Sequence, residues 1–205
     1  MRWTIPNILT VMRLAAAPGV ALAFAVFDRP YADWIAFALF ILAALTDYID
    51  GRLARAWQQE TNFGRVMDPI ADKAMVVVAL MVIVGLWGMR ALILVPVAFI
   101  LVREVFISGL REFLGAKAGK LKVTHLAKWK TTAQMLAIPV LLLAGVLQFD
   151  RRRGEPWIST WFHNWAEWTL QNGGLVLIWI AGLLTLMTGY DYLVKALPFL
   201  KDRQK

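Results

Sequence analysis

The chain has 205 residues, of which 60% are hydrophobic, and it carries 22 Lys and Arg against 14 Asp and Glu, a formal net charge of +8. Intrinsic disorder is excluded because disordered chains have low hydrophobicity. Only 18% of the residues are charged, where soluble globular domains have about 25%. No nucleic-acid partner is expected, because the basic residues are spread between long apolar stretches. The composition therefore predicts a polytopic membrane protein whose positive charge helps to orient it.

Six stretches of the chain are apolar and close to the length of about 20 residues that a helix needs to cross the hydrocarbon core. In chain order they are Ile8–Phe27, Trp34–Leu53, Ile70–Trp87, Ala91–Leu110, Thr131–Phe149 and Gly174–Lys195. We therefore predict an all-α, polytopic integral membrane protein with six transmembrane helices, forming a single domain over residues 1–205. The first stretch is interpreted as a retained helix rather than a cleaved secretory signal, because Asn7, Thr10 and Arg13 interrupt its apolar start.

Aromatic and basic residues indicate how these helices lie in the bilayer. Four tryptophans recur every three or four residues: Trp157, Trp161, Trp165 and Trp168. They share one helix face, and because tryptophan favours the headgroup region, we predict an interfacial amphipathic helix over Pro156–Trp168. Lysine and arginine are concentrated in the segments on the same side as the N-terminus, which predicts that both termini face the cytoplasm. The run Arg151-Arg152-Arg153 on the other side is an exception.

Four aspartates lie where the second predicted span ends and the third begins: Asp47, Asp50, Asp68 and Asp72. The short connection Ala56–Phe63 makes these helices antiparallel neighbours, so the four carboxylates should meet in one cavity. An aspartate at the middle of a span costs about 2.5–3.5 kcal/mol, so the cluster needs a partner. With no cysteine and only two, widely separated histidines in the chain, oxygen-held Mg²⁺ or Mn²⁺ that also binds substrate phosphates fits best. The alternative is a structural network of ion pairs with Arg52, Arg55, Arg65 and Lys73.

Small and basic residues beside the aspartates fit phosphate chemistry. Gly51 and Ala54 leave space on the second helix, and Gly64 lets a flat group pack against the third. Arg55 lies about two turns beyond the first aspartate, so it can hold a phosphate there. Pro69 predicts that the third helix begins near the third aspartate, so that its first N–H groups also favour anions.

These residues form one pattern: Asp47-x2-Asp50-Gly51-x2-Ala54-Arg55-x8-Gly64-x3-Asp68-x3-Asp72. The pattern resembles the signature of the CDP-alcohol phosphotransferases, a family of integral membrane enzymes with six helices. The resemblance implies a binuclear metal site on Asp47, Asp50 and Asp68. It also implies that Asp72 lies beside the metals and is the catalytic general base. The residues expected to bind the donor, CDP-diacylglycerol, are Asn7, Thr10, Arg13, Gly51, Ala54, Arg55 and Gly64; for the first three, helix-end capping is an alternative.

Further segments resemble the members of this family that use glycerol 3-phosphate: Ile5-Pro6-Asn7-Ile8-Leu9-Thr10-x2-Arg13, Arg103-Glu104, Gly109-Leu110-Arg111-Glu112-Phe113-Leu114 and Lys128-x-Lys130-Thr131-x2-Gln134. The resemblance implies phosphatidyl transfer from CDP-diacylglycerol to glycerol 3-phosphate, giving phosphatidylglycerol phosphate and CMP. Four basic residues are expected to bind the acceptor phosphate: Arg103, Arg111, Lys128 and Lys130. Serine, inositol phosphate and phosphatidylglycerol are the alternative acceptors.

The expected setting is the bacterial inner membrane, with the active site on the cytoplasmic side, membrane lipids as neighbours and a homodimer as the assembly. A divalent-cation transporter is the alternative from another class of protein. Transport carboxylates, however, are expected near the bilayer midplane at broken helices. These aspartates lie instead at one end of the predicted spans, beside a phosphate-binding arginine.

Overall fold

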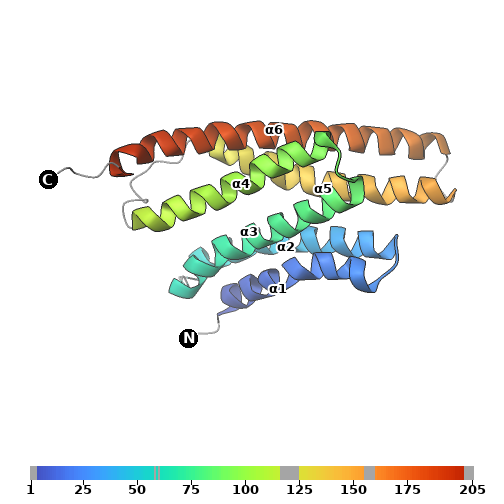
Figure 1. Ribbon diagram of the computed structural model, residues 1–205. Helices are drawn as coiled ribbons and strands as arrows, with labels where there is room; N and C mark the ends of the chain where they lie inside the picture. The colour runs from blue at the N-terminus through green and yellow to red at the C-terminus, as the bar shows by residue number, and fades with distance from the viewer. Residues whose placement is uncertain (1–3, 58, 60, 116–124, 155–159, 201–205) are drawn as a thin grey trace. The chain divides into compact units, whose positions relative to one another are not determined.

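The computed structural model describes residues 4–57, 59, 61–115, 125–154 and 160–200. These residues form six helices: α1 (Ile5–Val26), α2 (Tyr31–Ala56), α3 (Asn62–Trp87), α4 (Ala91–Leu114), α5 (His125–Arg153) and α6 (Thr160–Leu200) (Figure 1). Each helix is long and apolar enough to cross a membrane. The predicted all-α architecture with six membrane-spanning helices is therefore confirmed.

The start of α3 differs from the sequence-based expectation. The helix begins at Asn62, with Thr61 as its N-cap, and the Thr61 side chain accepts a hydrogen bond from the Gly64 N–H at 3.0 Å. Pro69 therefore lies inside the helix, and the prediction of a helix start near Asp68 is wrong. The hydropathy criterion missed the first two turns because they are polar, whereas the cap depends on the Thr61 hydroxyl.

The predicted interfacial helix is not a separate element. Thr160–Trp168 forms the first part of α6, which continues without a break to Leu200; residues 155–159 lie outside the described part of the chain. The tryptophan face itself is present, because Trp161, Trp165 and Trp168 are all exposed. The one proline within α6, Pro198, lies close to its end at Leu200, so no proline breaks the helix just after Trp168.

The chain divides into two compact units, one comprising residues 1–88 and 138–174 and the other residues 89–137 and 175–205. In the first unit α1 packs along both α2 and α3, while the direct contact between α2 and α3 is slight (Figure 1). Buried alanines on α1 and α2, including Ala17 and Ala36, let these helix backbones come close. The short connection had led us to expect direct packing of α2 against α3. The two helices are joined mainly through α1 instead.

Local contacts account for the arginine run at the end of α5. Arg151 Nε lies 2.9 Å from Glu167 Oε2 on α6, and the Arg153 guanidinium lies 5.7 Å from the centre of the Phe149 ring. The carboxyl end of a helix also favours positive charge. The run therefore has local structural partners, although it departs from the charge pattern that orients the other segments.

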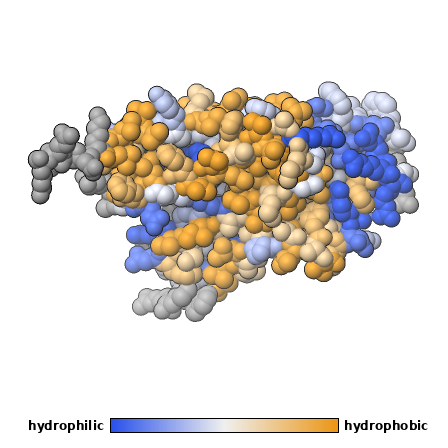
Figure 2. Space-filling model, in the orientation of Figure 1, coloured by the Kyte–Doolittle hydropathy of each residue, from blue (hydrophilic) through white to orange (hydrophobic). Residues whose placement is uncertain are grey.

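In the second unit α4 packs against α6. Ile107 and Leu110 of α4 form a core with Tyr192 and Ala196 of α6. Apolar side chains cover much of the visible molecular surface (Figure 2). Exposed apolar residues such as Val105, which is 74% exposed, fit a surface that faces lipid.

Candidate active site

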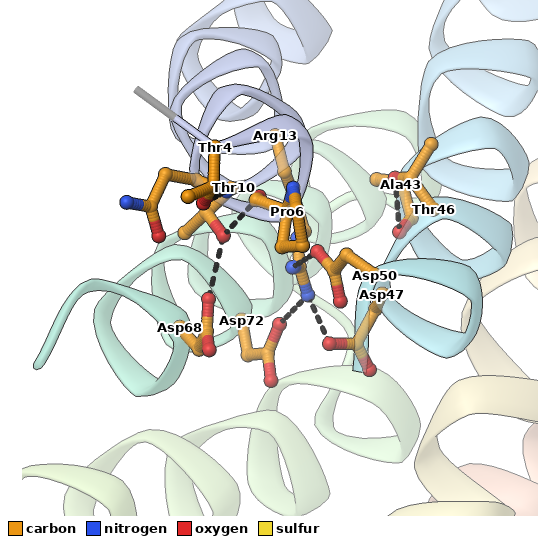
Figure 3. Close-up of polar contacts among 11 residues, drawn as sticks. Thr4, Pro6, Thr10, Arg13, Ala43, Thr46, Asp47, Asp50, Asp68 and Asp72 are labelled. Atoms are coloured by element: carbon orange, nitrogen blue, oxygen red, sulfur yellow. Dashed lines mark hydrogen bonds and ion pairs between the residues drawn. The ribbon is translucent and has the colours of Figure 1, made fainter. Parts of the chain in front are cut away.

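An arginine from α1 is enclosed by carboxylates from α2 and α3 (Figure 3). The Arg13 side chain is 1% exposed, and its Nη1 donates to Oδ1 of both Asp47 and Asp72. Its Nη2 donates to Asp50 Oδ2 at 2.5 Å. Asp47 and Asp50 lie one turn apart on α2 and so face α1 together, while Asp72 comes from α3. Three of the four predicted aspartates therefore converge on one guanidinium.

Thr10 brings the fourth aspartate to the same place. Thr10 Oγ1 lies 2.6 Å from Asp68 Oδ1 and donates to it (Figure 3). The neighbouring polar residue on this face of α1, Asn7, accepts a hydrogen bond from Thr61 Oγ1 at 2.8 Å. The N-cap of α1 is Thr4, so helix-end capping does not explain why Asn7 and Thr10 are polar. They join α1 to α3.

The aspartates differ in how accessible they are. The side chains of Asp47 and Asp72 are each 38% exposed, whereas that of Asp50 is 5% exposed. Asp47 and Asp72 are therefore the more open of the three carboxylates that bind Arg13, whereas Asp50 is almost fully covered.

The ion pairs described for the aspartates include a cation that the sequence analysis did not consider for this network. Arg52 is exposed, and its Nη1 donates to the Tyr48 hydroxyl at 2.7 Å. Arg13, which lies within the first span, binds three of the four aspartates. Its position was a usable signal, because a charged residue inside a membrane helix requires a partner.

A pocket of about 240 Å³ lies beside the aspartates. Its lining includes five of the residues predicted to bind CDP-diacylglycerol: Asn7, Thr10, Gly51, Ala54 and Gly64. Asp50 and Asp68 also line it. Of the other two predicted residues, Arg13 contacts the aspartates instead of the pocket, and the Arg55 side chain lies outside the described part of the structure.

Sequence reasoning missed four lining residues: Pro6, Gln59, Thr61 and Arg65. Thr61 could have been predicted from the sequence, because threonine is a favoured N-cap residue at the start of a helix. Gly64 is needed where α1 meets α3, because a Cβ there would lie 3.2 Å from Asn7 Oδ1 and 3.4 Å from Thr61 Oγ1. The missing side chain thus keeps α1 close to α3 at the pocket wall.

In the second unit, two of the predicted acceptor-binding residues share one carboxylate. Glu104 Oε1 lies 3.1 Å from Arg103 Nη1 and 2.5 Å from Lys130 Nζ. Arg111 lies instead over the ring of Tyr192, at 5.5 Å from its centre, and Lys128 is exposed. The described contacts join neither of these last two residues to Glu104.

Comparison with known proteins decides the family. The model of the CDP-alcohol phosphatidyltransferase family matches residues 3–187. The chain belongs to this family. A Cereibacter sphaeroides protein named CDP-diacylglycerol–glycerol-3-phosphate 3-phosphatidyltransferase is 55% identical to it over the whole of both chains. Proteins of the same name from Rickettsia bellii and Haemophilus influenzae are 38% and 35% identical and cover 92% and 98% of both chains, respectively.

Enzymes of the CDP-alcohol phosphatidyltransferase family generally use a divalent metal ion. Within the described residues, no group of three or more histidine, cysteine, aspartate or glutamate side chains is arranged to hold one. Three carboxylates bind the Arg13 guanidinium instead. The donor set nevertheless fits a hard cation, because all its donors are oxygen atoms and three carboxylates share the single positive charge of one guanidinium. Asp47, Asp50, Asp68 and Asp72 are thus the residues that would hold a metal.

Proposed function

We propose that this enzyme transfers the phosphatidyl group of CDP-diacylglycerol to glycerol 3-phosphate, giving phosphatidylglycerol phosphate and CMP. The observation that carries the proposal is the full-length similarity to the Cereibacter sphaeroides protein named for this reaction. The four aspartates beside a pocket are consistent with it. The reaction requires a charged donor diphosphate to be held at a membrane enzyme, which a polar pocket next to a carboxylate cluster can do.

The donor site in this proposal is the pocket together with the aspartates. Asn7, Thr10, Gly51, Ala54 and Gly64 would contact the CDP group, and Arg55 would bind a phosphate. The proposed cofactor is Mg²⁺ or Mn²⁺, with a binuclear site on Asp47, Asp50 and Asp68 and with Asp72 beside it. When bound, the metal would neutralise the diphosphate and favour departure of CMP.

Asp72 is the proposed general base. Its side chain is 38% exposed and so reachable by a small alcohol, whereas that of Asp50 is 5% exposed. The Asp72 carboxylate would accept the proton of the acceptor hydroxyl while that oxygen bonds to the phosphorus attached to the lipid. The bond from this phosphorus to the CMP oxygen breaks, and CMP leaves with the electron pair.

The proposed acceptor site consists of Arg103, Arg111, Lys128 and Lys130. Two of its cations, Arg103 and Lys130, lie together on the carboxylate of Glu104, and such a pair of positive groups suits the phosphate of glycerol 3-phosphate. Serine, an alternative acceptor, has no phosphate group for these residues to bind.

The remaining proposals concern the setting of the enzyme. We place it in the bacterial inner membrane with both termini and the aspartates on the cytoplasmic side, because Lys and Arg are concentrated there. We also propose a homodimer, as the family resemblance implies. The two units are proposed to form a single domain, because the continuous helices α5 and α6 each contribute residues to both.

A panel of acceptors tests the proposed reaction. The purified protein in detergent, with CDP-diacylglycerol and Mg²⁺ or Mn²⁺, should release CMP with glycerol 3-phosphate and not with serine, inositol phosphate or phosphatidylglycerol. If CMP is released only with another alcohol, that alcohol and not glycerol 3-phosphate is the acceptor. Metal-ion flux into liposomes without any CMP release would instead favour the transporter.

A further inference from the structure

Arg13 binds the oxygen atoms that a metal ion would need. Its guanidinium donates to one oxygen of each of three carboxylates: Asp47, Asp50 and Asp72. A divalent cation in this cluster would bind carboxylate oxygens as well. The guanidinium and the cation therefore compete for the same ligands, and their like charges repel each other at short distance.

The carboxylates are also what holds the Arg13 head group in place. Within the described residues, Arg13 Nε is buried and has no hydrogen-bond partner. Each hydrogen bond described for the guanidinium goes to one of the three aspartates. No second anchor thus opposes its release when another cation takes over the carboxylates.

In the protein without metal, by contrast, the guanidinium is needed. Four carboxylates meet between α1, α2 and α3, and the side chain of Asp50 is almost fully buried. Like charges brought together in such a place repel strongly unless a cation is present. Arg13 supplies that cation from α1, while Thr10 binds the fourth carboxylate through a hydrogen bond.

We propose that Arg13 is the internal counter-ion of the aspartate cluster in the metal-free enzyme, and that it must release these carboxylates for a metal ion to bind. This inference rests on the metal site in the proposed function. Arg13 is in this sense a positioning residue: it keeps α1, α2 and α3 assembled around the empty ligand set, and it lowers the apparent affinity for metal. Once released, its guanidinium is free to bind a phosphate of the donor.

The test measures Mn²⁺ binding to the purified full-length protein in detergent, without substrates, by the loss of the free-Mn²⁺ signal in electron paramagnetic resonance. Arg13→Gln removes the competing charge and should bind Mn²⁺ at least about tenfold more tightly, because like charges at short distance repel each other strongly. Arg13→Lys keeps the charge but contacts the carboxylates through one nitrogen. Its Mn²⁺ affinity should therefore lie between those of the wild type and Arg13→Gln. Affinity of Arg13→Gln equal to or below that of the wild type overturns the proposal.

Arg52→Gln is the matched control. It removes the same charge two residues from Asp50, but Arg52 is exposed and bonds to Tyr48, so its Mn²⁺ affinity should stay close to that of the wild type. An equal gain in Arg52→Gln would mean that general electrostatics, and not displacement of Arg13, sets the affinity.

Melting temperature gives a second, independent measurement. In EDTA, Arg13→Gln should melt well below the wild type and Arg52→Gln, and Mn²⁺ should restore most of the loss. If the variant can be isolated only with Mn²⁺ present, its unfolding on addition of EDTA supports the proposal. A metal-free Arg13→Gln as stable as the wild type overturns it. Mn²⁺ affinity and melting temperature are both measured without substrate. This inference can therefore fail while the acceptor panel succeeds, and the acceptor panel can fail while this inference holds.

Discussion

Thr10 Oγ1 on α1 donates a hydrogen bond of 2.6 Å to Asp68 Oδ1 on α3. The bond joins the first helix to the third of the four aspartates. It also fixes one oxygen of that carboxylate and leaves the other to face the pocket region. The candidate active site is therefore built by three helices, because α1 binds the aspartates that α2 and α3 carry.

Thr10→Val removes this hydrogen bond with little change in shape. A hydrogen bond to a charged group contributes about 1.5–3 kcal/mol, so we expect kcat/KM to fall by about tenfold or more, with Thr10→Ser retaining most of the activity. Thr46→Val is the control, because Thr46 Oγ1 donates only to the backbone oxygen of Ala43 on its own helix. Equal rates for Thr10→Val and the wild type would show that Asp68 needs no such support.

Asp72→Asn separates proton transfer from donor binding. A general base contributes about 10²–10⁴-fold, so CMP release should fall by that factor, while the variant still binds CDP-diacylglycerol. Asp47→Asn should also weaken metal-dependent binding of the donor. Radiolabelled donor binding and CMP release measure the two effects. Near-normal turnover in Asp72→Asn would rule out the role as base.

Gly64→Ala tests the close approach of α1 to α3. The added Cβ would lie 3.2 Å from Asn7 Oδ1, so α1 or Asn7 must shift at the pocket wall. We expect a higher KM for CDP-diacylglycerol and an unchanged KM for the acceptor. Gly109→Ala on α4 is the control, since a Cβ there meets nothing within 4 Å. An unchanged donor KM in Gly64→Ala would mean that the pocket tolerates the shift.

The sequence was informative where the chemistry is local to one segment. Apolar length alone placed all six helices, and the spacing of Asp47, Asp50, Asp68 and Asp72 was enough to predict that they meet. Both signals depend on residues close together in the chain, whose faces follow from helix geometry.

Contacts between distant segments could not be predicted in the same way. The partner of Asp47 is Arg13, 34 residues earlier. This pairing depends on how α1 packs, which the spacing of residues within one segment does not predict. The start of α3 was missed for a related reason, because its first two turns are polar and are stabilised by the Thr61 cap and by contact with Asn7. A criterion based on the length of apolar spans detects neither the Thr61 cap nor the contact with Asn7.

Lys130 and Lys128 provide a matched pair for the acceptor site. Lys130 is buried and binds Glu104, while Lys128, two residues away, is exposed. Lys130→Met should raise the KM for glycerol 3-phosphate by about tenfold, because it removes a desolvated charge near the proposed phosphate site. Lys128→Met should raise the KM for glycerol 3-phosphate much less.

Arg111→Ala should also raise the KM for the acceptor more than the KM for the donor. Equal effects on both KM values would show that Arg111 is not part of the acceptor site.

Gly174→Ala and Gly173→Ala test packing within the first unit. A Cβ on Gly174 would lie 2.7 Å from Leu141 Cδ2 and 2.8 Å from Leu141 Cγ, whereas one on Gly173 would meet nothing within 4 Å. Leu141 is fully buried, so it cannot move aside freely, and Gly174→Ala should destabilise the protein by about 1–3 kcal/mol. Gly173→Ala should be neutral or stabilising by up to about 1 kcal/mol, because it favours the helix. Melting temperatures in detergent measure both, and equal values would mean that α5 and α6 pack less tightly at this point than the contact with Leu141 requires.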